Sequence, residues 1–146
     1  MNNGKICVSV CAETADEMIS KIKQAEQFAD VIEVRFDCLD PSETLIWAQL
    51  KAFRQQVPGK VLATHRPNLS GQGGNSHLSK AERIKFWREH VFEFTDWADI
   101  EYDLELSDSR AYIRAVWKRI IWSFHAFGVV PNENHLVDLY SRIAEN

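Results

Sequence analysis

The stretch Asp30-Val31-Ile32-Glu33-Val34-Arg35-Phe36-Asp37 decides the fold. From Ile32 to Asp37 apolar and charged residues alternate strictly, and this period of two predicts a β-strand. The segments on both sides have helical spacing, which favours a parallel sheet covered on both faces. Glu33 and Arg35 would then be buried, so they must either pair structurally or serve a site. The stretch alone leaves both possibilities open.

The rest of the chain repeats this strand-then-helix order. Strands are predicted at 6–10, 61–66, 98–104 and 120–125, and helices at 14–25, 40–53, 79–91, 107–117 and 131–143. Five βα units in succession predict a parallel sheet. Either an open doubly wound sheet or part of a (βα)₈ barrel fits. A full TIM-type barrel needs roughly 250 residues, so in the second case this chain would supply about five of its eight units.

Four of the predicted helices have recognisable start signals. Thr14–Glu17 and Ser79–Glu82 fit the capping box, in which each side chain bonds the other residue's backbone N–H. Pro41 is expected at the first position of its helix, because proline is favoured there. Pro131 or Asn132 should open the last helix. Pro58-Gly59 predicts a turn.

Composition excludes several classes of function. A net charge of −4 and a pI near 5.7 give no basic surface for nucleic acid. No apolar run is long enough to span a membrane, and the first residues lack a signal segment, so we expect a cytoplasmic protein. Cys7 and Cys11 are too far apart along a strand for a disulfide. We therefore expect all three cysteines, Cys38 included, to be reduced and mostly packed, and no spacing indicates a metal site.

On four of the predicted strands, the face opposite the apolar one becomes polar near the carboxyl end. Its members are Glu33 and Arg35, Thr64 and Arg66, Asp99 and Glu101, and Ser123 and His125. Active sites of (βα)₈ barrels lie at that end. Any one of these residues is more often structural than catalytic. Their recurrence on four strands predicts a common pocket containing Glu33, Arg35, Arg66, Glu101 and His125.

The same residues resemble, in order and spacing, the motifs of type I 3-dehydroquinate dehydratases. The matching positions are Ser9, Glu33-x-Arg35-x-Asp37, Thr64-x-Arg66-Pro67, Gly73-Gly74, Asp99-Ile100-Glu101 and Ser123-Phe124-His125. Each motif is short, but the ordered series extends over nearly the whole chain and is specific. The resemblance implies an α/β fold that is a partial (βα)₈ TIM-type barrel, with residues 1–146 as a single domain that forms its N-terminal part.

The resemblance also implies a reaction and residue roles. The family removes water from 3-dehydroquinate in the shikimate pathway, through a Schiff base between a lysine and the substrate ketone. His125 would be the catalytic acid/base. Ser9, Glu33, Arg35 and Arg66 would bind the small-molecule substrate, with support from Gln72, Asp99 and Glu101. Neither a metal nor a dissociable cofactor is implied, and neither a nucleic acid nor a membrane is an expected partner.

Three departures from the family pattern lead to alternatives. The family's lysine is on a sixth strand, and no lysine in these five units substitutes for it. The family's Glu before Gly-Gly is Gln72, and its His-Asp-Phe is His125-Ala126-Phe127. We therefore expect the chain alone to be inactive. It could instead be a non-catalytic half-barrel, or part of a split barrel completed by a second copy or a C-terminal segment.

Two weaker signals have structural explanations. Gly71-Gln72-Gly73-Gly74 lacks the Lys-Ser/Thr of a phosphate loop, so it predicts a mobile active-site loop. His65 should face the helix side of its strand as a satisfied core histidine.

Overall fold

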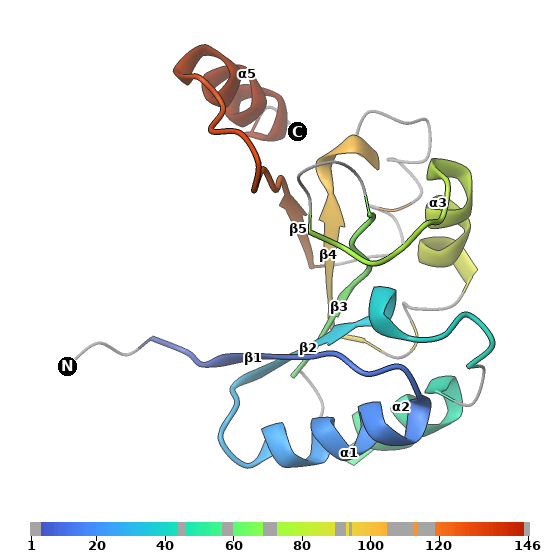
Figure 1. The fold of residues 1–146 in the computed structure, drawn as a ribbon. Coiled ribbons are helices and arrows are strands. Elements are labelled where there is room, and N and C mark those ends of the chain that lie inside the picture. Colours follow the sequence, from blue (N-terminus) through green and yellow to red (C-terminus); the bar gives the residue numbers. More distant parts are fainter. Residues whose placement is uncertain are drawn as a thin grey trace.

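The strands form one parallel sheet in chain order. The computed structural model describes residues 4–43, 46–56, 60–68, 73–89, 93, 95–104, 113 and 119–144. Its sheet has the order β1-β2-β3-β4-β5, and each strand is parallel to the next (Figure 1). The strands are β1 (Cys7–Val10), β2 (Val31–Arg35), β3 (Val61–Thr64), β4 (Trp97–Glu101) and β5 (Ile120–Ser123). A doubly wound sheet would reverse its strand order at a switch point, so the partial barrel is confirmed and the open sheet is wrong.

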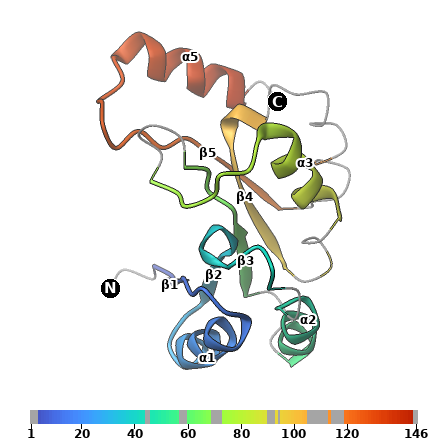
Figure 2. The ribbon, with the colours of Figure 1, turned by 45° about the vertical axis from the view of Figure 1, so that its right-hand side comes forward.

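The core lies between the sheet and the helices α1 (Ala15–Glu26), α2 (Ile46–Gln56) and α3 (Lys80–Glu89). Figure 2 shows α1 and α2 side by side below β1, β2 and β3, with α3 farther along the sheet. On β2, Ile32 and Val34 are fully buried while Glu33 and Arg35 are half-buried. The alternation read from the sequence therefore separates an apolar face, packed under the helices, from a polar face.

The strand register lines up the polar residues. Arg35 is paired with Thr64, and Thr64 with Asp99. β2, β3 and β5 stop earlier than their alternating patterns suggest, because the chain leaves the sheet after Arg35, Thr64 and Ser123. Asp37, Arg66 and His125 consequently lie just beyond strand ends. Short 3₁₀ turns, η1 (Phe36–Cys38) and η2 (Tyr102–Leu104), follow β2 and β4.

The predicted helix starts are largely confirmed. Thr14 accepts a hydrogen bond from the Glu17 N–H, although the Glu17 carboxylate pairs with Lys21 rather than with the cap. The Ser79 box is reciprocal: its N–H donates to Glu82 at 2.8 Å and its hydroxyl accepts from the Glu82 N–H at 3.3 Å. At α5 (Glu133–Ala144), the Asn132 side chain accepts from the His135 N–H. Asn132, not Pro131, is the cap.

The start predicted at Pro41 is wrong. Asp40 accepts hydrogen bonds from both the N–H and the hydroxyl of Ser42 at 2.8 and 2.6 Å. This local pairing folds Pro41 and Ser42 into a turn, since an aspartate side chain competes with helical hydrogen bonding. Several other predicted features lie outside the described residues: Leu45, the Pro58-Gly59 turn, 69–72, 90–92 and most of the helix at 107–117, of which Ile113 is helical and fully buried.

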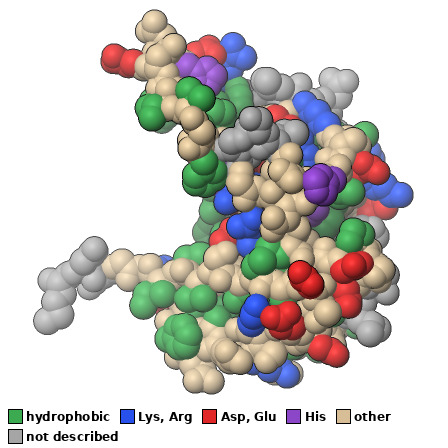
Figure 3. Space-filling model, viewed as in Figure 1, with side chains coloured by type: hydrophobic (Ala, Val, Ile, Leu, Met, Phe, Trp, Pro, Cys, Tyr) green, Lys and Arg blue, Asp and Glu red, His purple; other side chains and the backbone are tan. Residues whose placement is uncertain are grey.

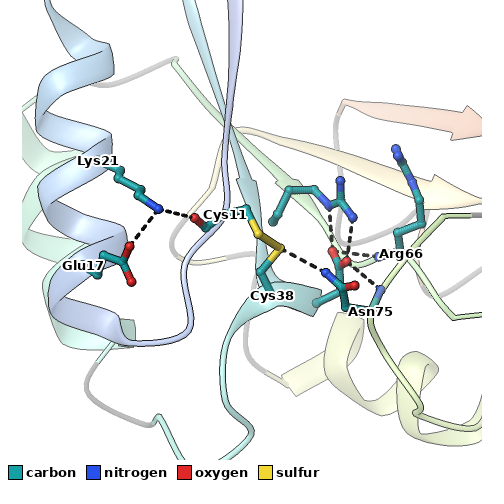
Figure 4. Close-up of a disulfide and its surroundings, with 8 residues drawn as sticks. Cys11, Glu17, Lys21, Cys38, Arg66 and Asn75 are labelled. Carbon is teal, nitrogen blue, oxygen red and sulfur yellow. Dashed lines mark hydrogen bonds and ion pairs between the residues drawn. A yellow bond between two sulfur atoms is a disulfide. The ribbon is translucent and has the colours of Figure 1, made fainter.

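The prediction for the cysteines is wrong. Cys11 and Cys38 form a disulfide with their Cα atoms 5.5 Å apart (Figure 4), and Cys7 is exposed rather than packed. The sequence argument tested only the pair on one strand. Cys11 follows β1 and Cys38 closes η1 after β2, and parallel pairing brings these two strand ends together.

The end of the chain is poorly covered. α5 has no buried residue and extends away from the body of the sheet (Figures 1 and 3). Large apolar side chains are exposed on α5 and on the segment before it: Phe124, Phe127, Val129, Val130, Leu136, Val137 and Tyr140. In the described part of the chain, no helix has the length and hydropathy to cross a bilayer.

Candidate active site

Four side chains meet at the carboxyl ends of β3, β4 and β5: Arg66 and His125 follow β3 and β5, and Asp99 and Glu101 lie on β4. The Nδ1 atom of His125 lies 2.6 Å from Oε1 of Glu101, and that oxygen lies 3.6 Å from Nε of Arg66. The Arg66 guanidinium also lies 3.5 Å from Asp99. Sequence parity placed all four on one side of the sheet, and the structure brings them into contact.

Glu101 is the most buried member, with its side chain 4% exposed. Burial raises the pKa of this carboxyl, because charge is costly away from water. The nearby His125 and Arg66 oppose that shift, and Asp99 adds to it. The charge of Glu101 is therefore set by burial and by these three neighbours together.

The His125 ring is oriented from two sides. Glu101 occupies Nδ1, which leaves Nε2 as the nitrogen for proton exchange with a bound molecule. The ring stacks on Phe127 with centroids 6.0 Å apart. Phe127 in turn covers Gly73, where φ is +67° and an added Cβ would lie 2.9 Å from the phenyl ring. Gly73 therefore reaches His125 through Phe127. Position 126, where the family has an aspartate, is an alanine and offers no carboxylate.

Gly74 fixes the backbone beside Arg66. A Cβ at Gly74 would lie 2.2 Å from the Arg66 carbonyl oxygen, so only glycine allows this approach. The Ser76 N–H donates to that same carbonyl, and the Asn68 N–H donates to the Ser76 carbonyl. The Gly-Gly motif thus holds the loop against the chain that carries Arg66.

Arg35 is held by Asp37 rather than by the His125 cluster. Two guanidinium N–H groups donate to the two Asp37 oxygens at 2.8 and 2.7 Å. The backbone N–H groups of Arg66 and Asn75 also donate to Asp37 (Figure 4). Burial alone would raise the pKa of Asp37, but the Arg35 hydrogen bonds and the two backbone donors hold it below its usual value. The Asp37 bond likewise raises the pKa of Arg35, and Glu33 and Asp99 add to that shift.

The remaining predicted residues are less closely joined. Glu33 accepts a hydrogen bond from the Thr64 hydroxyl at 2.7 Å. Ser9 is exposed on β1 in register with Glu33, and Gln72 lies outside the described residues. The sequence contained Asp37 in the Glu-x-Arg-x-Asp motif, but nothing predicted that it would join Arg35 to two loops. Asn75 carried no signal at all.

No described lysine reaches the cluster. Lys21 donates to the Cys11 carbonyl, Lys60 to the Ala29 carbonyl and Lys80 to the Asp103 carbonyl, and Lys85 pairs with Glu89. Within the described residues, no three His, Cys, Asp or Glu side chains are grouped to hold a metal ion. The described site therefore offers an imidazole, carboxylates and guanidiniums for proton transfer and for binding hydroxyl or carboxylate groups.

Sequence comparison identifies relatives along almost the whole chain. A family model described as type I 3-dehydroquinase matches residues 6–146. A 3-dehydroquinate dehydratase of Methanococcus vannielii is 26% identical over 141 residues, which cover 94% of this chain and 61% of that protein. One from Saccharolobus solfataricus is 28% identical over 138 residues, covering 93% and 59%. The chain thus spans less than two thirds of the length of these relatives.

Solved structures agree on the fold. The type I 3-dehydroquinate dehydratase of Clostridium difficile superposes with a TM-score of 0.80 at 22% identity, covering 97% of this chain and 58% of that one. The enzyme of Geobacillus kaustophilus gives 0.81 at 18% identity, covering 99% and 58%. The described half of the barrel wall thus has the geometry found in complete barrels.

Proposed function

Because the chain belongs to the type I 3-dehydroquinase family, we propose that Arg66, Glu101 and His125 form the acid–base part of a site that dehydrates 3-dehydroquinate. The product would be 3-dehydroshikimate, in the shikimate route to aromatic amino acids. The observation that carries the proposal is the 2.6 Å contact between His125 and a buried glutamate at the carboxyl ends of the strands. The cytoplasmic location expected from the sequence stays a prediction.

In the proposed reaction, Nε2 of His125 takes a proton from the carbon next to the substrate ketone. A lysine amine would first form the Schiff base with the ketone, with loss of one water, and this iminium takes up the C–H electron pair as an enamine. His125 then gives the proton to the departing hydroxyl; as the C–O bond breaks, the enamine electrons form the new C=C bond and water leaves. Hydrolysis of the Schiff base finally releases the product ketone and the free amine. Glu101 supports the imidazolium that exists between the two steps, because it lies against Nδ1.

The two arginines have different parts in this proposal. Arg66 Nε makes no hydrogen bond among the described residues: Glu101 lies 3.6 Å from it, and Asp99 lies 3.5 Å from a terminal nitrogen of the guanidinium. Its guanidinium is thus available to a substrate hydroxyl or to charge that develops during the reaction. Asp37 already holds Arg35 through two hydrogen bonds, so Arg35 would present a fixed positive charge to the ring of the substrate. Glu33 and Ser9 would bind hydroxyl groups.

The amine is the missing component among the described residues. We expect the 146-residue chain by itself to form little 3-dehydroshikimate, because no described lysine lies near His125 to form the Schiff base. Without that electron sink, proton removal leaves an enolate beside four carboxylates and two guanidiniums: Glu33, Asp37, Asp99, Glu101, Arg35 and Arg66. In this proposal the lysine would come from a part of the barrel outside these five βα units.

Two measurements on the purified chain test these statements separately. Titration with 3-dehydroquinate should shift the NMR resonances of the His125 ring and leave those of the exposed His135 on α5 unchanged. Arg66→Gln should lower the affinity for 3-dehydroquinate measured from the His125 shift. Arg54→Gln should not, because Arg54 pairs with Asp96 before β4, at the opposite end of the sheet. Absence of any His125 shift at saturating substrate would contradict the proposed site.

Borohydride treatment with substrate tests the expected inactivity. Mass spectrometry should find no stable adduct, and chromatography should find little product. An adduct on any lysine, or rapid formation of 3-dehydroshikimate, would show that the chain supplies its own amine.

A second proposal concerns how the half-barrel is completed. Exposed apolar side chains on α5 and before it favour a second surface covering them, either another copy of the chain or a complementing C-terminal segment. A non-catalytic half-barrel would show the same association without substrate binding. Analytical ultracentrifugation should find a dimer or larger species. Leu136→Glu should disrupt this assembly, and Asn134→Glu, on the same helix, should preserve it. Monomeric behaviour at high concentration would contradict it.

A further inference from the structure

A cavity of about 650 Å³ lies on the helix side of the sheet, between η1, the turn before α2, and α3. Its apolar wall is an aromatic cluster. Phe36 stacks on Trp47 with centroids 5.3 Å apart and 14° between the ring planes, and Phe86 meets Phe36 edge-on at 5.6 Å. Cavities of this volume with aromatic walls are typical of small-molecule sites.

One polar group is buried in this aromatic wall. His65 is 7% exposed and lies 4.4 Å from the Phe86 ring, centroid to centroid. The sequence predicted a satisfied core histidine; the burial is confirmed, but the Nδ1 atom has no hydrogen-bond partner. Burial lowers the pKa of His65 to about 4, so at neutral pH the ring is uncharged, with one donor and one acceptor nitrogen. His65 therefore adds no positive charge to the cavity wall.

The rim of the cavity is acidic. Asp40, Glu43 and Glu82 border it, against the single ammonium of Lys85. Asp37 also borders it, but its oxygens are occupied by Arg35 and by two backbone N–H groups. The charge facing an entering molecule is therefore negative, which favours a cation and disfavours an anion.

The cavity is separate from the strand-end cluster. His65 and Arg66 are neighbours in sequence, yet His65 contacts Phe86 of α3 while Arg66 contacts Glu101 of β4. The two side chains therefore leave the chain on opposite sides of the sheet. A molecule in the cavity would not contact His125.

We infer that this cavity is a second binding site, which takes a flat aromatic molecule carrying an amine. The ring would lie against the aromatic wall of Phe36, Trp47 and Phe86, and the ammonium would lie at the acidic rim. The aromatic faces add a favourable interaction with the cation.

Calorimetric titration of the chain with tryptamine and with indole-3-acetate tests the inference. The two probes share one ring and differ in charge. We expect tryptamine to bind about tenfold more tightly or better, since a single favourable charge interaction is of that order. Glu43→Gln should weaken tryptamine binding, and Lys85→Glu should strengthen it. Glu133→Gln, an exposed carboxylate on α5, should leave it unchanged.

Two further variants locate the probe. Leu78→Trp should abolish binding by filling the cavity, whereas His125→Ala should have no effect because that ring lies on the other side of the sheet. Loss of binding in Leu78→Trp could also come from unfolding of that variant. The increase in tryptamine affinity expected for Lys85→Glu cannot come from misfolding, so it tests the site independently. Equal affinity for the two probes, no binding of tryptamine, no response to either charge variant, or loss of binding in His125→Ala would each overturn the inference.

Discussion

The buried His65 should make the stability of the protein depend on pH, and His65→Phe should remove that dependence. The ring is 7% exposed and its pKa is lowered to about 4 from an ordinary value of 6.5. Burial is the largest cause; Arg83 and Arg35 lower the pKa further, while Asp37 and a backbone group oppose it. Phenylalanine has a similar shape and would pack on Phe86 without titrating.

The sign follows from proton binding in the two states. As pH falls below about 6.5 the unfolded chain takes up a proton at His65, whereas the folded chain does so only near pH 4. The stabilising contribution of the uncharged His65 is therefore fully present above its unfolded-state pKa. It is lost progressively as the pH falls towards the folded-state pKa. The shift of about 2.5 units corresponds to roughly 3.4 kcal/mol at full loss, and to about 2 kcal/mol by pH 5.

Urea unfolding at a series of pH values between about 7.5 and 4.5 provides the measurement. Other titrating groups contribute equally to both proteins, so the difference between the wild-type and His65→Phe curves isolates this residue. The gap should change by about 2 kcal/mol from neutral pH to pH 5. His135→Gln, on the exposed face of α5, should follow the wild type. Parallel curves for wild type and His65→Phe would refute the argument, because they would mean that the ring is not desolvated in solution.

Three other predictions concern contacts between distant parts of the chain. Cys11→Ser opens a disulfide that spans a sequence separation of 27 and should lower the free energy of unfolding by roughly 3.5 kcal/mol in urea, whereas Cys7→Ser should be neutral. Asp37→Asn leaves the Arg35 cation without its counter-charge and should cost about 3 kcal/mol or more; a loss near zero in thermal unfolding would contradict the buried pair. Gly74→Ala should reduce both thermal stability and 3-dehydroquinate binding, since its Cβ would collide with a carbonyl; unchanged values for both would show that the loop approaches less closely.

The sequence by itself determined the units of the fold. The alternation at Glu33 and Arg35 depends only on neighbouring residues, so it could be read without any tertiary information. The Thr14 and Ser79 caps are equally local, because each bond joins residues three apart. Parity along each strand also identified the side of the sheet that carries His125. These features were predictable because helix and strand geometry repeats every few residues.

Tertiary structure decided which of those residues meet. Glu101 and His125 are 24 residues apart, and their contact depends on β4 and β5 pairing in one register. Cys11 and Cys38 approach only because β1 and β2 end side by side, so an argument confined to one strand missed them. The cavity around His65 likewise depends on how two helices and a turn pack over a strand. Such contacts follow from the placement of whole elements, and local periodicity does not contain that placement.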